Sequence, residues 1–350
     1  SDQRLLYYFD YESKTAMPFC AEPNCMHDTE ECPAKNNYDA YIIVNNNLYA
    51  IESTSDRQLS EDISYTQSNI VSTDIGGTNK RILATFDGSV SGKPPRDSNI
   101  YYYKDCIYFV AEALEIKDSI NTNYSKWNAY CYNIKRKSLK KLGELCSGYH
   151  CFVIVQGMTE DRLYFNYHFS EKDLDYISYD NEDDYFSDLE SLLQIDNLYL
   201  DLETHEIHKN NLPNIDDQSR VFAGYYFYSN NRGHFIARNL MDNTEVKILD
   251  KPSSHYYWMG DRLIFYVDKN PNDSESKIES DIEKYYWLPK TNTIHEIPLR
   301  KDQIVFKPFI KKGKYCYGIS IYPEYSGKVC LSYTKVANLT KENLKIIKVR

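Results

Sequence analysis

The sequence predicts an all-β fold built from repeated four-stranded antiparallel sheets, and three observations carry this prediction. Tyrosine, which suits a pleated and half-buried surface, occurs 34 times in 350 residues, whereas glycine occurs 13 times and proline 12 times. Short aromatic and aliphatic segments alternate with polar turns. One pattern of strands recurs, with first strands near residues 41, 101, 150, 221, 256 and 304, and such self-similarity is the signature of a repeat architecture.

The second repeat shows the pattern most completely. A short aromatic strand at 100–103 is followed by a polar turn and a strand at 106–110, and after a variable loop by strands at 129–134 and 139–142. The steps between first strands range from 35 residues (221 to 256) to 71 residues (150 to 221). They scatter around the roughly 40–50 residues of a four-stranded propeller blade.

Apolar alternation on both faces of each sheet indicates how the repeats assemble. A single sheet cannot bury both faces, whereas stacking neighbours and closing the ring does. We therefore expect one β-propeller domain over 1–350, with six blades near 40–86, 98–146, 150–212, 218–250, 254–299 and 302–350. Residues 1–19 match only part of a blade, so they form either a partial seventh blade or a ring-closing hairpin, and 20–38 form a loop rich in cysteine and histidine.

Two polar, acidic insertions account for the longer repeats. The first runs from Ser170 to Gln194 and contains one helical pattern, at 188–193, which predicts a short helix. The second, from Asn270 to Glu283, overlaps a calcium-loop spacing that begins at Asp268. Because the sixth position of that loop is Asp273 where glycine is wanted, a solvated hairpin insertion is the favoured interpretation.

The sharpest local motif is Cys20-x4-Cys25-x-His27-x4-Cys32, which places three thiols and one imidazole within 13 residues. Soft sulfur and nitrogen ligands of this kind are what zinc prefers, so these four residues form a candidate zinc site. The alternatives are a disulfide between two of the cysteines with one spare thiol, or three solvated thiols. The six other cysteines are scattered, and they read as small buried apolar residues in strands.

Catalytic motifs are weak. The segment Gly88-Ser89-Val90-Ser91-Gly92 places valine where the nucleophile of G-x-S-x-G would stand. No catalytic residue is therefore predicted, although a site gathered across several blades would leave no local motif. Aromatic runs such as 101–103, 225–228 and 256–258 could line a peptide or carbohydrate platform, but alternate side chains packing against neighbouring sheets explain them better.

One segment resembles a known family. Asp74, Gly77, Asn79 and Leu83 follow the D-x-x-G-x-N-x-x-x-L close of a blade in low-density-lipoprotein-receptor-like or TolB-like β-propellers, although the other copies lack the glycine pair. The opening segment from Pro18 to Ala34 resembles exported lipoproteins of Gram-positive gut bacteria. The resemblance implies a propeller that is secreted or at the cell surface and that binds something, and it transfers no catalytic residue.

The charge composition argues against two classes of binding partner. Asp and Glu number 51 against 41 Lys and Arg, and the net charge of −10 argues against binding to nucleic acid or to anionic lipid through a basic patch. No apolar stretch approaches 18 residues, so no transmembrane helix is expected. We expect an extracytoplasmic ligand-binding or protein-interaction module for a protein, peptide or carbohydrate, with a signal or lipid anchor removed upstream. A cytosolic location, and a hydrolase or lyase at the central channel, are the alternatives.

Overall fold

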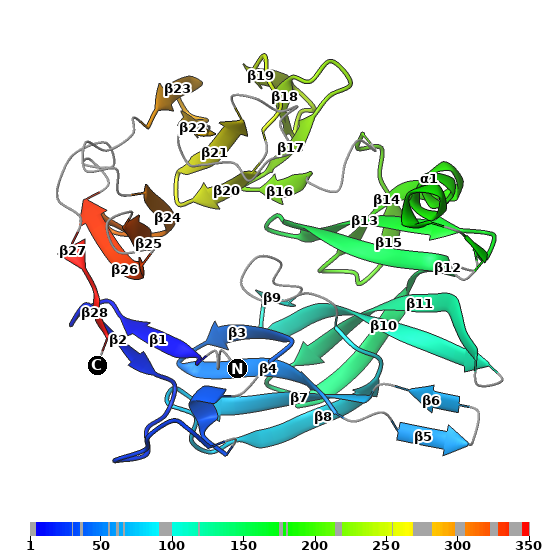
Figure 1. Ribbon diagram of the computed structural model, residues 1–350, viewed down its shortest axis with the longest axis horizontal. Coiled ribbons are helices and arrows are strands. Elements are labelled where there is room, and N and C mark those ends of the chain that lie inside the picture. The colour runs from blue at the N-terminus through cyan, green and yellow to red at the C-terminus, as the bar shows by residue number, and fades with distance from the viewer. Residues whose placement is uncertain are drawn as a thin grey trace. The chain divides into compact units, whose positions relative to one another are not determined.

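A computed structural model gives the fold of the chain (Figure 1). It describes residues 5–29, 31–35, 38–54, 57–60, 63–65, 67–90, 100–117, 120–174, 178–179, 181–213, 219–253, 255–268, 282–297, 305–322, 328–335 and 345–349. The chain divides into two compact units, one with residues 1–8 and 18–214 and the other with residues 9–17 and 215–350.

The first unit opens with a four-stranded antiparallel sheet. Its strands, in spatial order, are β3 (Ala40–Val44), β4 (Asn47–Ser53), β7 (Gln67–Asp74) and β8 (Arg81–Asp87). A small hairpin of β5 (Arg57–Ser60) and β6 (Ile63–Tyr65) lies between β4 and β7 in the chain. Asn45 and Asn46 both have positive φ, 49° and 63°, as a two-residue hairpin turn requires.

Two further sheets of this unit share one long strand. The first contains β9 (Ile100–Tyr103), β10 (Cys106–Lys117) and β11 (Ile120–Asn133), and the second contains β13 (Arg162–Ser170), β14 (Gln194–Asp201) and β15 (Ile207–Lys209). The strand β12 (Ser138–Met158) pairs with β11 through its first half and with β13 through its second. It is therefore the last strand of one sheet and the first of the next.

The insertion between β13 and β14 contains a helix. This helix, α1 (Glu182–Leu192), begins at Asn181, whose side chain accepts a hydrogen bond from the Asp184 amide. Three acidic residues in the first turn favour the start of the helix through its dipole. The helix predicted at 188–193 is therefore present, but it begins earlier, at Glu182, and ends at Leu192. Within the described part of the chain, no helix has the length and apolar character needed to span a membrane.

The second unit contains three more four-stranded antiparallel groups. They comprise β16 (Arg220–Phe222), β17 (Tyr225–Ser229), β18 (Phe235–Asn239) and β19 (Glu245–Leu249); β20 (His255–Met259), β21 (Arg262–Asp268), β22 (Ile282–Leu288) and β23 (Thr293–Glu296); and β24 (Val305–Lys312), β25 (Tyr315–Tyr322), β26 (Lys328–Lys335) and β27 (Lys345–Ile346). Of the calcium-loop spacing, only Asp268 lies within the described residues.

A three-stranded sheet joins the two ends of the chain. It consists of β1 (Tyr7–Asp10), β2 (Thr15–Pro18) and the C-terminal β28 (Lys348–Val349). β2 and β28 pair in parallel, with Ala16 opposite Val349. The buried side chains of Ala16, Tyr317 and Ile347 form one cluster, against which Phe9 packs. The N-terminal strands are thus held noncovalently by the C-terminal segment.

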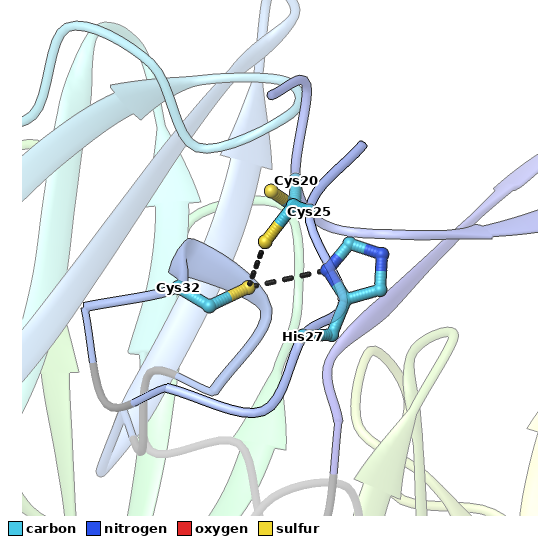
Figure 2. Close-up of side chains that lie close together, drawn as sticks. All are labelled: Cys20, Cys25, His27 and Cys32. Atoms are coloured by element: carbon cyan, nitrogen blue, oxygen red, sulfur yellow. Dashed lines mark hydrogen bonds between the residues drawn. The ribbon is translucent and has the colours of Figure 1, made fainter. Parts of the chain in front are cut away.

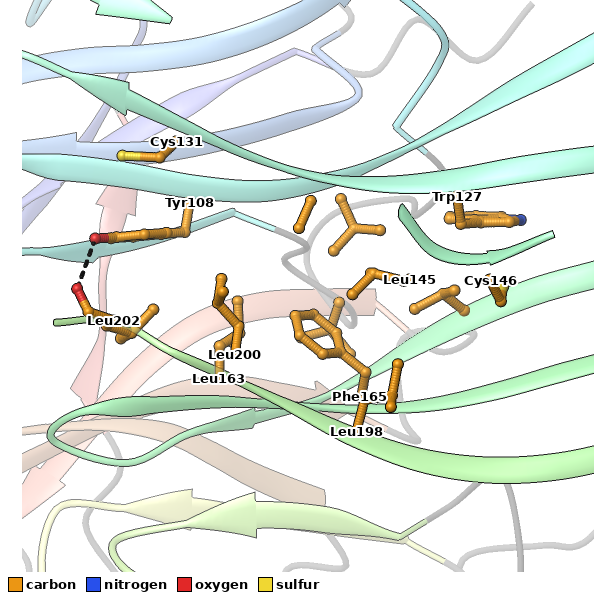
Figure 3. Packing of buried hydrophobic residues seen from close by; sticks show 14 of the residues in the cluster. Tyr108, Trp127, Cys131, Leu145, Cys146, Leu163, Phe165, Leu198, Leu200 and Leu202 are labelled. Atoms are coloured by element: carbon orange, nitrogen blue, oxygen red, sulfur yellow. Dashed lines mark hydrogen bonds between the residues drawn. The ribbon is translucent and has the colours of Figure 1, made fainter. Parts of the chain in front are cut away.

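Successive side chains of β10 are buried on opposite faces of its sheet. Ile107 and Phe109 pack in one cluster with residues of β4 and β7, whereas Tyr108 and Val110 pack in another with residues of β13 and β14. All four are at most 2% exposed. Figure 3 shows the second cluster, with Tyr108 and the leucines of β13 and β14 between the strands. This sheet has two apolar faces, and a neighbouring sheet covers each one.

The second unit repeats this arrangement. On β21, Leu263 and Phe265 belong to one cluster, whereas Ile264 and Tyr266 belong to another. Strand alternation therefore serves two neighbouring sheets at once, as the sequence predicts. The prediction of an all-β fold is confirmed.

Replacing Phe109 by alanine tests the contact between sheets. Phe109 is 1% exposed and packs against Phe86 of β8 in the neighbouring sheet, with ring centroids 5.0 Å apart. We expect Phe109→Ala to lower the free energy of unfolding by about 3–5 kcal/mol, because it removes apolar contacts and leaves a cavity. Phe186→Ala, at a side chain 53% exposed on α1, should change it by less than about 0.5 kcal/mol. Equal losses in chemical denaturation would contradict the packing described.

Candidate metal centre

The loop between β2 and β3 contains the four predicted ligands. It leaves β2 at Pro18, and its first residues are tied down by backbone hydrogen bonds from the Phe19 amide to the Leu6 carbonyl, 2.8 Å, and from the Ala21 amide to the Gly76 carbonyl, 2.8 Å. The loop ends in a short 3-10 turn, η1 (Pro33–Lys35). Its first ligand and its last are therefore both held close to regular structure.

The four side chains converge on one point. Figure 2 shows Cys20, Cys25, His27 and Cys32 pointing toward one another, and their ligand atoms all lie within 4.8 Å of one another. The sulfurs of Cys25 and Cys32 are 3.6 Å apart, and Nδ1 of His27 lies 3.3 Å from the sulfur of Cys32. In the described residues, this is the one group of three or more His, Cys, Asp or Glu side chains arranged to share a metal ion.

Two of these separations, 3.6 Å and 3.3 Å, lie close to the edges of a zinc tetrahedron, whereas the limit for the whole set is 4.8 Å. Bonds of about 2.3 Å to sulfur and about 2.0–2.1 Å to nitrogen place neighbouring ligands of a tetrahedral zinc about 3.5–3.8 Å apart. A disulfide instead needs sulfurs about 2.05 Å apart. Cys20, Cys25 and Cys32 are all free thiols here. Three sulfurs and one nitrogen would complete a closed, structural type of site with no position left for a substrate.

Two ordinary residues in the loop adopt a left-handed backbone conformation. Asn24 has φ of 63° and His27 has φ of 57°. Asparagine tolerates this region well, whereas histidine visits it less often. Because the unusual conformation at His27 accompanies a ring nitrogen turned toward Cys32, the backbone strain at this position coincides with the candidate ligand geometry.

The site is buried on one side and open on the other. Cys32 is 2% exposed, while Cys20, Cys25 and His27 are partly exposed. Burial, with the neighbouring thiols of Cys25 and Cys32 adding to its effect, raises the pKa of the Cys20 thiol to about 11.

The turn conformation is not the only factor that requires glycine in the Gly76-Gly77 pair of the first sheet. Gly76 and Gly77 have φ of 101° and 81° in the turn between β7 and β8. A Cβ on Gly77 would lie 2.1 Å from the Cβ of Pro33 and 3.1 Å from the Phe19 carbonyl oxygen. The turn therefore packs directly against the loop that contains the four candidate ligands. The sequence signal was the presence of a Gly-Gly pair in this repeat and in no other.

The other candidates lie elsewhere. Ser89 forms an isolated β-bridge with Glu112, and Ser91 and Gly92 lie outside the described residues. In the aromatic run at 101–103, Tyr102 packs against one buried cluster, whereas Tyr101 and Tyr103 pack against the other. This run contributes to packing between sheets.

Comparison with known proteins identifies a fold but no family. No protein-family model matches the chain, and no curated protein matches it. The acylaminoacyl peptidase of Pyrococcus horikoshii is similar in structure, with a TM-score of 0.50 and 14% identity over 87% of this chain and 44% of that one. Oligogalacturonate lyase from Vibrio parahaemolyticus has a TM-score of 0.49 and 9% identity, over 86% and 85% of the two chains. An uncharacterized Listeria monocytogenes protein has a TM-score of 0.46 and 10% identity, over 90% and 86%.

The likeness to the peptidase places the chain among structures similar to β-propeller proteins. At such identities a shared fold carries no activity from one protein to another. The chain spans 44% of the length of the peptidase it matches.

Replacing Gly77 by alanine tests the close approach of the loop. Gly224 has the same φ of 81°, but a Cβ there would meet nothing within 4 Å, so Gly224→Ala measures the cost of the backbone conformation alone, about 1–2 kcal/mol. We expect Gly77→Ala to cost about 1–3 kcal/mol more, because Pro33 must move. Chemical denaturation of the two variants measures the difference, and an equal cost for both would contradict the contact with Pro33.

Proposed function

We propose that this chain is an extracytoplasmic ligand-binding or protein-interaction module in which one zinc ion, held by Cys20, Cys25, His27 and Cys32, fixes a recognition loop. The observation that carries the proposal is the convergence of four soft ligand atoms within 4.8 Å of one another. Zinc is the resident ion that such a set of sulfur and nitrogen ligands fits best. The site is structural, because the protein supplies all four ligands.

The loop needs such an ion because it has little core of its own. Most of its residues between Ala21 and Glu31 are exposed or half-exposed, so apolar burial contributes little to holding its shape. Metal binding supplies that free energy directly, since a chelated loop loses its freedom when the ion binds rather than when the partner does. A loop ordered in advance binds a partner at lower entropic cost.

Met26 supports a role for this loop in recognition. It lies between two of the ligands, Cys25 and His27, and its side chain is 80% exposed. A methionine presented on a fixed loop is a flexible apolar contact of the kind used at adaptable protein-binding surfaces. We therefore propose a peptide segment or protein surface as the partner, ahead of a carbohydrate and against a nucleic acid, for which a chain of net charge −10 is poorly suited.

The extracellular or cell-surface location and the kinship with exported lipoproteins belong to the same proposal. They are supported by the resemblance of the 18–34 segment. The competing hypothesis is a hydrolase or lyase with residues gathered across several sheets. No residue role supports it, since likeness at 14% identity carries the fold alone.

Metal content tests the zinc centre. The full chain, purified with a phosphine reductant and equimolar zinc and then desalted, should retain one zinc per chain by plasma mass spectrometry. Cys25→Ser and His27→Ala should each weaken zinc binding by about 100-fold or more, because a quarter of the ligand set is lost. Cys316→Ser, at a fully buried cysteine in β25, is the matched control and should retain the ion. A wild-type chain that holds no metal under these conditions would refute the site.

A peptide-display selection tests the recognition loop separately. Peptides selected on the zinc-loaded chain should bind Met26→Asp at least about tenfold more weakly, because a charge replaces an apolar contact. Met241→Asp, at a methionine 94% exposed between β18 and β19, is the matched control and should leave binding unchanged. Fluorescence anisotropy measures both. Equal effects of the two substitutions, or selected peptides that bind equally well after chelation of the zinc, would count against the loop.

A further inference from the structure

A second pair of thiols, remote in sequence from the metal-ligand loop, meets inside the first unit. Cys146 and Cys151 both lie on β12, and their sulfurs are 2.6 Å apart. Carbon atoms in contact pack about 3.5–4.0 Å apart, and sulfur is larger than carbon. Both cysteines are free thiols in this structure, yet two sulfurs at this separation are far closer than unbonded neighbours and approach the length of a covalent bond, about 2.05 Å.

A bend in the strand brings the two cysteines together. Side chains five residues apart on a regular strand point to opposite faces. Here the pairing of β12 with β13 shifts between Tyr149 and Phe152, and His150 has φ of 51°. This irregularity turns Cys146 and Cys151 into the same buried cluster.

Neighbouring groups hold the bend in place. The Cys151 carbonyl accepts hydrogen bonds from the Trp127 indole nitrogen, 2.9 Å, and from the Ser125 hydroxyl, 3.1 Å. Nε2 of His150 accepts a hydrogen bond from the Leu174 amide, 3.1 Å. A Cβ on Gly148 would come within 3.1 Å of the Ser170 carbonyl oxygen. These contacts therefore hold the bend in the conformation that points the two cysteine side chains toward each other. Figure 3 shows Cys146 beside Trp127 in this cluster.

We propose that Cys146 and Cys151 form an intrachain disulfide that staples the bend of β12, where the strand passes from one sheet to the next. Both S–H bonds break and one S–S bond forms. The two electrons pass to an oxidised small-molecule disulfide, such as glutathione disulfide, which takes up the two protons and leaves as two thiols. This staple is independent of the zinc loop, and it suits an exported chain because disulfides persist in oxidising compartments.

The bond forms during folding rather than afterwards. Both cysteines are buried, 8% and 5% exposed, so a reagent has little access to them in the folded chain. The adjacent Cys151 thiol and burial both raise the pKa of the Cys146 thiol, and a protonated thiol is a poor nucleophile for disulfide exchange. Once formed and covered, the bond is shielded from reductants for the same reasons.

Peptide mapping of the full chain tests the staple. The chain is reduced and unfolded, refolded with zinc in a buffer of reduced and oxidised glutathione, and alkylated after unfolding. Trypsin then releases the segment from Leu142 to Arg162, whose two cysteines are Cys146 and Cys151. We expect this peptide to lack two hydrogens and to carry no alkyl group in most chains. After refolding with a phosphine reductant, both of its cysteines should be alkylated.

Two cysteine variants and a hydrogen-exchange measurement test the disulfide further. Cys316→Ser, a buried cysteine that donates to the Thr334 carbonyl, should keep the internal disulfide, whereas Cys146→Ser should leave Cys151 alkylated. In the oxidised wild-type chain, the amides of 147–150 should exchange about tenfold more slowly than in the reduced chain. Full alkylation of both cysteines after glutathione refolding, or their linkage to another cysteine such as Cys131, would overturn the proposal, as would unchanged exchange at the bend.

Discussion

The whole structure depends on the fact that a β-strand offers its side chains alternately to two sides. In β10, Tyr108 and Phe109 are adjacent in sequence, and each is almost completely buried, but they belong to different clusters. A sheet made of such strands has two apolar faces. Exposing either face to solvent would cost free energy, because it would return several large apolar side chains to water. Each sheet therefore requires neighbours on both sides. Tyrosine serves this need well because its ring packs while its hydroxyl can reach a polar group at the edge, as Tyr108 does with the Leu202 carbonyl, 3.2 Å away.

That constraint also governs the ends of the chain. An outermost sheet would leave one apolar face open, and the last strand β28 would be an unpaired edge. Pairing of β2 with β28 satisfies the edge, and Phe9 packs on the cluster that contains Tyr317 and Ile347. Strands from opposite ends of the chain thus build one sheet, which makes unfolding of either end dependent on the other.

Much of this architecture could be read from the sequence, because alternation and turn residues are local signals. The strand pattern near 100–142 and the asparagine turn at 45–46 are of this kind, and so is the grouping of Cys20, Cys25, His27 and Cys32. The sharing of β12 between two sheets was harder to foresee. The predicted boundary between the second and third repeats falls at 147–149, but the chain bends there within one continuous strand instead of ending it in a turn. The pairing of Cys146 with Cys151 was missed because five-residue spacing on a regular strand separates side chains, and only the bend at His150 reverses that.

The Gly76-Gly77 pair shows a different limit of sequence reasoning. A turn that needs positive φ explains why glycine suits these positions, and that explanation is complete in itself. It does not explain why only this repeat has two glycines, because the cause lies in Pro33, more than forty residues earlier in the chain. Contacts between distant segments leave their trace in sequence only as an unexplained departure from a repeat, and such departures are where a functional loop is best sought.

The two groups of thiols, in the loop and on β12, differ in the distance between their sulfurs, and this distance decides which chemistry suits each group. In the loop, Cys25 and Cys32 stand 3.6 Å apart with an imidazole beside them, which is the spacing of ligands around an ion. On β12, Cys146 and Cys151 stand 2.6 Å apart among apolar side chains, with no room for an ion between them. By our proposals, the exposed loop, which has little core, gains its rigidity from a metal, whereas the buried bend already has a core and gains a covalent link. Both devices act where the repeated sheets cannot stabilise the chain by stacking alone: in a connecting loop, and at a strand that leaves one sheet for the next.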